Sequence, residues 1–196
     1  VPVTAHARPS ERSRVVMRVS PYTDFTRDAH VLLVTERRLE RPGRRWVRVR
    51  LPRRPNGSQG WIREEFVVLA RTTTRIVVRV RPRRVEVWRG DRRVMSVRAD
   101  VGTSATPTPL GRFAVHDPVP TTPATRPTYG RYIITLTAYS PVLRTFNGGN
   151  GLVAIHGYAG VGGNAVSHGC IRITDGAVVR LRKYAAPGVP VDIVAR

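Results

Sequence analysis

Two residues that could act together in covalent chemistry lie two positions apart near the end of the chain, in the segment Ser167-His168-Gly169-Cys170. Cys170 is the only cysteine in the protein. A thiol becomes a strong nucleophile only as its thiolate, and a nearby imidazole can take its proton near neutral pH. In an extended segment the side chains of His168 and Cys170 project to the same side. The pair therefore indicates acyl transfer, with Cys170 as the nucleophile and His168 as the base.

Gly169, between these two residues, has no side chain and lets a substrate approach the backbone closely. The amides of Gly169 and Cys170 could then stabilise the oxyanion of a tetrahedral intermediate. The alternative is a buried, inert cysteine, because free cysteine is among the most buried residue types. The flanking histidine and glycine favour a reactive thiol.

The motif extends beyond this pair. Ile155-His156-Gly157, a spacer, and Ser167-His168-Gly169-Cys170-Ile171-Arg172 together resemble the L,D-transpeptidases of bacterial cell walls, the YkuD catalytic domain. The similarity extends over about residues 75–196, because Thr108-Pro109-Leu110-Gly111-Arg112-Phe113 resembles the upstream signature of that family. The resemblance implies a cysteine-dependent peptidoglycan L,D-transpeptidase that forms 3→3 crosslinks through a thioacyl-enzyme and releases D-alanine.

The resemblance also implies roles for the neighbouring residues. Ser167 resembles the residue whose backbone carbonyl orients the histidine. His156 and Gly157 resemble positions that flank the substrate pocket, although His156 could equally be a structural histidine. Arg172 would meet a carboxylate of the stem peptide in bidentate fashion or brace the loop backbone.

The partners and inhibitors that the resemblance implies are peptidoglycan stem peptides, namely a donor tetrapeptide and an amine acceptor, and carbapenems that acylate the cysteine. No cofactor is expected. Zinc is the chemical alternative, with His156, His168 and Cys170 as ligands and water as the fourth. It is disfavoured because Asp175 is the only nearby carboxylate and no glutamate follows Glu86.

Two other functions stay open. An L,D-carboxypeptidase would use the same cysteine and histidine, with water in place of the acceptor amine. A non-catalytic cell-wall-binding protein would not need them, so the intact thiol, histidine and glycine disfavour it.

The charge of the chain also bears on its partners. The net charge is +21, and Lys183 is the only lysine among 34 basic residues. Such a surface attracts polyanions, and anionic wall polymers are the partners that we expect. A basic recognition helix, zinc-finger spacing and RNP-like aromatic motifs are all missing, so specific nucleic-acid binding is not expected.

Location is less directly encoded. No signal peptide is visible in the residues given, and no apolar run is long enough for a membrane helix. It begins at Val1 rather than Met. We expect an exported protein of the periplasm or cell wall whose signal or anchor has been removed.

The N-terminal part, residues 1–70, predicts a small domain of short strands. Apolar runs at 15–19 and 31–34 precede a hairpin whose strands, 46–51 and 61–63, flank a turn with Asn-Gly. The order resembles a bacterial SH3-like barrel. Trp46 and Trp61 are expected in its core rather than in a ligand groove.

The second part, residues 71–196, predicts the catalytic domain. Its prolines predict a loop at 117–131 that could act as a lid over the substrate. A helix over about 176–185 would be capped by Thr174 or Asp175. The expected strands are 76–80, 85–88, 94–97, 133–136, 152–155 and 189–194. The fold class is therefore mainly β, with an SH3-like small barrel followed by a β-sandwich-like catalytic domain that has one short helix.

Overall fold

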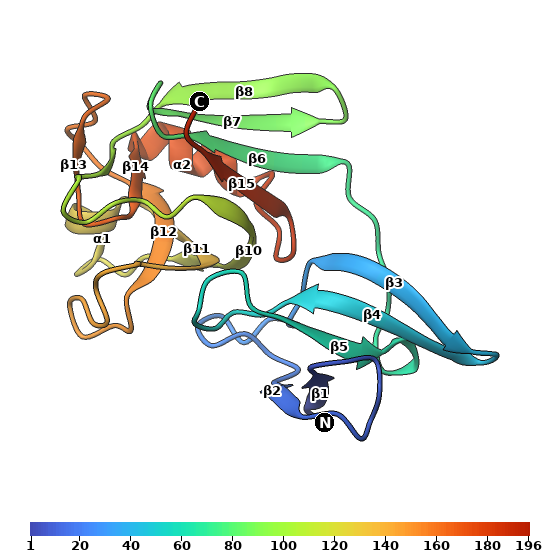
Figure 1. The fold of residues 1–196 in the computed structure, drawn as a ribbon. Coiled ribbons are helices and arrows are strands. Elements are labelled where there is room, and N and C mark those ends of the chain that lie inside the picture. Colours follow the sequence, from blue (N-terminus) through green and yellow to red (C-terminus); the bar gives the residue numbers. More distant parts are fainter.

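The computed structural model describes residues 1–196 and shows two main β-sheets joined by a single connection (Figure 1). The first sheet has five antiparallel strands in the order β2-β1-β5-β4-β3. A single 3-10 turn, η1 (Glu64–Phe66), follows it. The strands of this first sheet are β1 (Val3–His6), β2 (Val15–Val19), β3 (Val34–Arg41), β4 (Arg44–Arg50) and β5 (Gln59–Arg63).

The second sheet has eight strands in the order β14-β12-β11-β10-β15-β6-β7-β8. The pairs β12/β14 and β15/β6 are parallel, and the others are antiparallel. Its strands are β6 (Thr74–Arg79), β7 (Arg84–Arg89), β8 (Arg92–Arg98), β10 (Gly111–Pro120), β11 (Tyr132–Tyr139), β12 (Leu152–Gly157), β14 (Ile171–Ile173) and β15 (Pro190–Val194). The remaining elements are the strand pair β9 (Val101–Gly102) and β13 (Ala165–Ser167), the one-turn helix α1 (Arg126–Tyr129) and the helix α2 (Asp175–Arg182).

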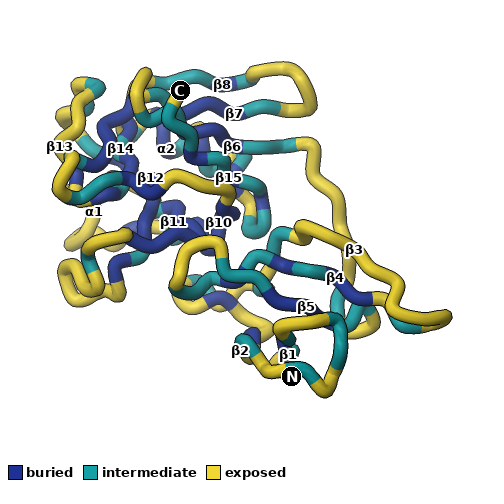
Figure 2. The backbone as a smooth tube through the Cα atoms, viewed as in Figure 1, coloured by how far each residue is buried: buried dark blue, intermediate teal, exposed yellow.

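We call the five-stranded sheet with its loops the first unit, and the eight-stranded sheet with its helices and loops the second unit. The main hydrophobic core lies in the second unit and contains 22 buried residues. Helix α2 buries Ala177, Val178 and Leu181 and packs against β11 and β12. The core of the first sheet contains only six buried residues, and every residue of β3 is exposed (Figure 2). Because apolar burial is the main stabilising term in folding, the first sheet depends more than the second on contacts with its neighbour.

Most predicted strands and the helix are present, and the mainly β fold with one short helix is confirmed. The predicted strand at 31–34 is wrong, because only Val34 belongs to a strand. The predicted loop is also wrong at Asp117–Pro120, which form the end of β10 and pair with β11. Within β10, only residues 111–114 pair with β15. The proline end of β10 therefore has a ladder on one side only, where a missing N–H is tolerated.

Trp46 is fully buried, as expected, and its indole Nε1 donates a hydrogen bond to Glu40 at 3.0 Å. Trp61 is 7% exposed. The SH3-like identity of the five-stranded sheet stays a prediction, as does the domain boundary at residue 70.

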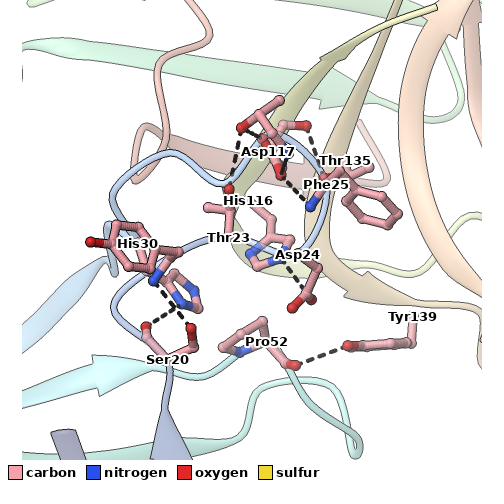
Figure 3. Close-up of polar contacts among 12 residues, drawn as sticks. Ser20, Thr23, Asp24, Phe25, His30, Pro52, His116, Asp117, Thr135 and Tyr139 are labelled. Atoms are coloured by element: carbon pink, nitrogen blue, oxygen red, sulfur yellow. Dashed lines mark hydrogen bonds and ion pairs between the residues drawn. The ribbon is translucent and has the colours of Figure 1, made fainter. Parts of the chain in front are cut away.

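The first unit docks on β10 through a buried carboxylate, Asp117 (Figure 3). Its Oδ2 accepts hydrogen bonds from the amides of Phe25 and Thr26, both at 3.0 Å, and its Oδ1 accepts one from the Thr26 hydroxyl at 2.6 Å. The neighbouring His116 lies at a register shift in β10 and points Nε2 at Asp24, 3.5 Å away. The loop after β2 is thus tied to the eight-stranded sheet.

Candidate active site

Cys170 immediately precedes β14, the edge strand of the eight-stranded sheet. Strand β14 runs parallel to β12, with Ile155 opposite Ile171 and His156 opposite Arg172. This register extended by one residue sets Cys170 beside Ala154, two residues before His156. From strand spacings, the Cα atoms of Cys170 and His156 are about 8 Å apart. The fold thus brings together two motif residues that are 14 positions apart in sequence.

The thiol of Cys170 lies in a low-polarity environment. Burial raises the pKa of Cys170 above its ordinary value, and this outweighs the opposing effects of the Ala154 backbone and the Arg172 charge. Desolvation disfavours the thiolate because it is the charged form. In the unliganded protein Cys170 is therefore a neutral thiol at pH 7, and a base must take its proton when it reacts.

His156 is the buried histidine of the motif and is 3% exposed. Its Nδ1 lies 2.9 Å from the carbonyl oxygen of Gly157. A carbonyl can only accept, so Nδ1 carries the hydrogen and Nε2 keeps its lone pair. Burial, aided by the charge of Arg172 and opposed by the Gly157 hydrogen bond, lowers the pKa of His156 to about 4. Its ring edge packs on Tyr129, with 5.1 Å between the ring centres.

His168 is placed differently from the prediction. The segment 168–169 is a bend rather than a strand, and Gly169 has a φ of 111°. The side chains of His168 and Cys170 therefore do not lie side by side on an extended backbone, and no hydrogen bond joins them. The exposed ring of His168 instead stacks on Phe146, with ring centres 4.9 Å apart and 29° between the planes.

The loop that holds Cys170 is braced by hydroxyl groups. The Ser167 hydroxyl donates to the carbonyl of Cys170 at 2.5 Å and accepts from the Gly169 amide at 3.1 Å. The Gly169 amide, predicted as one oxyanion donor, is therefore already engaged, whereas the Cys170 amide has no partner within the protein. The Ser167 carbonyl, predicted to orient His168, instead accepts hydrogen bonds from Thr103 and Thr106.

Thr108 explains the upstream signature. Its hydroxyl donates to the Gly169 carbonyl at 3.0 Å and accepts from the Gly102 amide at 2.9 Å. Thr108 is 4% exposed, so both contacts are shielded from water. The sequence predicted a structural role for this segment, and the structure shows which backbone groups it fixes.

Arg172 lies on β14 with its guanidinium over the ring of Tyr158, 4.5 Å from the ring centre. Its Nε is buried without a hydrogen-bond partner. Its backbone pairs with Asp100, whose Oδ2 is also buried without a partner. The guanidinium thus supplies positive charge next to both His156 and Cys170.

Sequence reasoning did not identify Tyr129 and Phe146, which pack on the two motif histidines. Each is separated from its histidine by more than 20 positions in the sequence. Only the three-dimensional pairing of β11 with β12, and the loop between them, brings them to the site.

No group of three or more His, Cys, Asp or Glu side chains is arranged to hold a metal ion. None of the helices has the length and apolar character needed to span a membrane.

The family model for the L,D-transpeptidase catalytic domain, YkuD, matches residues 73–193, which include the motif and its upstream signature. No curated protein sequence matches the chain significantly.

Three solved structures are similar to the chain to different extents. Bdellovibrio bacteriovorus Bd1075 is 20% identical, with a TM-score of 0.51 over 64% of this chain and 49% of that one. An L,D-transpeptidase from Stackebrandtia nassauensis is 15% identical, with a TM-score of 0.46 over 66% and 59%. One from Mycobacterium smegmatis is 15% identical, with a TM-score of 0.48 over 88% and 98%.

The chain spans about half the length of Bd1075 and about three fifths of the Stackebrandtia protein. At 20% identity the likeness to Bd1075 indicates a shared fold. The family match is the stronger finding, because it covers more than half of the chain and includes His156, Cys170 and Arg172. The chain therefore belongs to the YkuD family of L,D-transpeptidase catalytic domains.

Proposed function

We propose that this protein is a cysteine-dependent peptidoglycan L,D-transpeptidase that forms 3→3 crosslinks through a thioacyl-enzyme and releases D-alanine. The observation that carries the proposal is the arrangement of the single cysteine beside a buried, neutral histidine within the matched family domain. A neutral imidazole with a free Nε2 can accept the thiol proton as the sulfur attacks a carbonyl.

His156, rather than His168, is the residue that we now assign as the base. Its Nδ1 is held by the Gly157 carbonyl, so its ring orientation and tautomer are fixed as in catalytic triads, where a third group performs this task. His168 is exposed, stacks on Phe146 and makes no hydrogen bond to the thiol. Its exposed ring would instead face the bound stem peptide.

The reaction would proceed in two steps. Cys170 attacks the donor carbonyl, His156 takes the thiol proton and then gives it to the departing amine of D-alanine, and the amide of Cys170 donates a hydrogen bond to the oxyanion. An amine of a neighbouring stem peptide then attacks the thioester and restores the thiol. Arg172, with its unpaired Nε, is the group that we assign to a carboxylate of the stem.

The test is intact-protein mass spectrometry with a disaccharide-tetrapeptide that contains meso-diaminopimelate, together with analysis of the products. A transient adduct lost in Cys170→Ala, plus a crosslinked dimer, supports transpeptidation. Release of D-alanine with only a tripeptide product would make the enzyme an L,D-carboxypeptidase. Folded wild-type protein that gives neither adduct nor product would overturn the proposal and favour a wall-binding role.

Two variants separate the roles of the histidines. Loss of a general base typically costs about 10²–10⁴-fold in rate, so His156→Ala should slow acylation by this factor. His168→Ala should retain most of the acylation rate, and equal losses in both variants would contradict the assignment. A carbapenem serves as a second acylating probe, with Cys170→Ala as the control for its site of attachment.

The wider setting is proposed on the same basis. An enzyme with this activity would be exported to the periplasm or cell wall, and the +21 net charge favours attraction to anionic wall polymers. The five antiparallel strands of residues 3–63 support an SH3-like accessory module. A sedimentation assay with purified cell wall tests whether the protein binds wall, and its comparison at low and high salt tests whether charge attraction drives the binding.

A further inference from the structure

The loop between β11 and β12, residues 140–151, reaches the candidate site with its tip. Phe146 in this tip stacks on His168, and Asn147 donates a hydrogen bond to the Tyr129 hydroxyl at 3.4 Å. Tyr129 in turn packs on His156. The tip of a single loop therefore contacts, directly or through one residue, both histidines of the motif.

The legs of this loop are joined at their base by the Ser140 amide, which donates to the Gly151 carbonyl at 2.8 Å, but the tip has little support of its own. Residues 144–150 are all exposed, and the tip is closed only by the two backbone hydrogen bonds between Phe146 and Gly149. Segments with few buried contacts open at low free-energy cost. Something outside the tip must therefore fix where the loop points.

The support comes from the first unit, through Arg54. Its Nη1 donates to the carbonyl of Ser140 at 2.6 Å, and its Nη2 donates to those of Leu143 and Asn150 at 2.9 and 3.1 Å. The three carbonyls lie on both legs of the loop, so one guanidinium joins them. The charged donor makes each hydrogen bond stronger than a neutral one.

The same guanidinium is itself held in place. It lies over the ring of Tyr139, 4.9 Å from the ring centre, and the Tyr139 hydroxyl donates to the carbonyl of Pro52 at 2.9 Å. The Asn56 side chain pairs with both backbone groups of Tyr139, at 2.7 and 2.8 Å. The turn between β4 and β5 is thus docked at the end of β11. Gly151 leaves the space that Arg54 uses, because a Cβ there would lie 2.6 Å from Nη2.

We propose that Arg54, from the N-terminal sheet, is a positioning residue for the active site. It fixes the two legs of the 140–151 loop and so sets Phe146 against His168, two residues from the nucleophile. The N-terminal unit would then act as part of the catalytic apparatus, and not only as an accessory that binds wall. This inference rests on the proposed function, because its kinetic consequence is defined for acylation of Cys170.

The experiment compares full-length wild-type protein with Arg54→Ala, Arg54→Lys and Arg37→Ala. Arg37 pairs with Glu64 on the surface of the first unit, so its replacement removes the same charge without touching the loop. A small misplacement of a site can cost about 10–100-fold in rate. We expect that loss in Arg54→Ala for Cys170 acylation by a carbapenem. A lysine cannot supply three forked donors, so Arg54→Lys should recover little of it, and Arg37→Ala should match wild type.

A double-mutant cycle distinguishes positioning from general destabilisation. If Arg54 acts through the loop tip, Arg54→Ala should add little to the effect of Phe146→Ala, whereas independent effects would multiply. Full multiplication, full rescue by lysine, or an unchanged acylation rate in Arg54→Ala would each overturn the proposal.

Hydrogen exchange provides a readout that does not depend on the reaction. Arg54→Ala should raise exchange at residues 143–151 while the strands of the eight-stranded sheet keep their protection. Unchanged exchange in the loop would overturn the positioning role. If wild-type protein is not acylated at all, the proposed function fails, and this exchange measurement alone then decides whether Arg54 holds the loop.

Discussion

At the scale of single residues, closeness to the cysteine in sequence does not decide which histidine can act as its base. Of the two motif histidines, His168, two positions from the cysteine in sequence, is exposed and stacked on Phe146, whereas His156, 14 positions away, is buried and oriented by a carbonyl. Burial raises the pKa of Cys170 and lowers the pKa of His156, so both shifts favour the neutral form of the side chain. The free enzyme therefore holds a thiol and an imidazole rather than an ion pair.

This arrangement predicts the pH profile of Cys170. Because burial raises the pKa of the thiol, alkylation of free enzyme by iodoacetamide should be slow at pH 7 and rise about tenfold per pH unit to pH 9. Intact-protein mass spectrometry at a series of pH values measures the rate. A plateau reached near pH 6 would instead reveal a thiolate–imidazolium pair and contradict the neutral ground state.

The Thr108 hydroxyl gives a second prediction. Thr108→Val keeps the volume of the side chain but removes both hydrogen bonds to the buried backbone groups of Gly169 and Gly102. Buried groups left without partners cost about 1–3 kcal/mol each. We expect a lower free energy of unfolding in urea and slower Cys170 acylation. Thr122→Val, at an exposed position, is the control, and equal stability of the two variants would refute the bracing role.

Much of the site was predictable because the motif is local. The nucleophile and the residues around it could be named from the sequence, since residues 167–172 are contiguous. The histidine assignment could not be reached, because it depends on the bend at 168–169 and on the parallel pairing of β12 with β14. Alternation along a short segment assumes extended backbone, and one glycine with a φ of 111° removes that assumption.

At the scale of elements, the close approach of two backbones fixes the end of β12. A Cβ on Gly157 would lie 2.8 Å from the Cα of Gly130 and 3.1 Å from both Asp175 Oδ1 and Val178 Cγ1. The carbonyl of Gly157 is the group that orients His156. The packing of α2, and of Gly130 at the end of α1, against β12 therefore acts directly on the histidine.

Gly157→Ala tests this link. The added methyl group meets backbone that cannot move freely, and overpacking of this kind typically costs about 1–3 kcal/mol. We expect a lower melting temperature by calorimetry and a lower acylation rate, because the Gly157 carbonyl shifts. Gly160→Ala is the matched control, since its Cβ would lie in ordinary contact, 3.6 Å from Tyr158. Wild-type kinetics in Gly157→Ala would argue against the carbonyl as the orienting group.

Elements with clear alternation were predictable, and those with tertiary causes were not. The hairpin of β7 and β8 and the helix α2 follow from their local patterns. The extension of β10 through Pro118 and Pro120 does not, because prolines normally end strands. There the strand survives because it has a ladder on one side and receives the first unit on Asp117.

At the scale of the whole molecule, polar side-chain contacts join the two sheets. Asp117 receives the loop after β2, and Arg54 receives the loop before β12. Burial opposes ionisation of Asp117, but hydrogen bonds from Thr26, Thr23 and Phe25 outweigh it and lower its pKa. The contribution of Asp117 to stability is therefore present above its unfolded pKa, near 4, and is lost as the pH falls through its lower folded pKa.

His30 makes the stability of this interface depend on pH in a higher range than Asp117 does. Its ring packs edge-on to His116, with ring centres 5.1 Å apart, and its Nε2 is buried without a partner. Burial and then the charge of His116 lower the pKa of His30, and these outweigh the Ser20 carbonyl, Asp24 and Asp117, which raise it. The unfolded chain therefore binds the proton more readily than the folded one, and stability falls as the pH drops below about 6.5.

We accordingly expect the melting temperature to fall between pH 7 and pH 5, with His30 and His156 both contributing in this direction. Each such group contributes a slope of at most about 1.4 kcal/mol per pH unit. His30→Gln removes one titrating group and keeps a polar side chain, so its melting temperature should fall less over the same range. His6→Gln is the control, because His6 lies away from the junction, on β1. Parallel pH profiles for wild type and His30→Gln would show that the junction does not titrate, and would leave His156 as the source of the acid sensitivity.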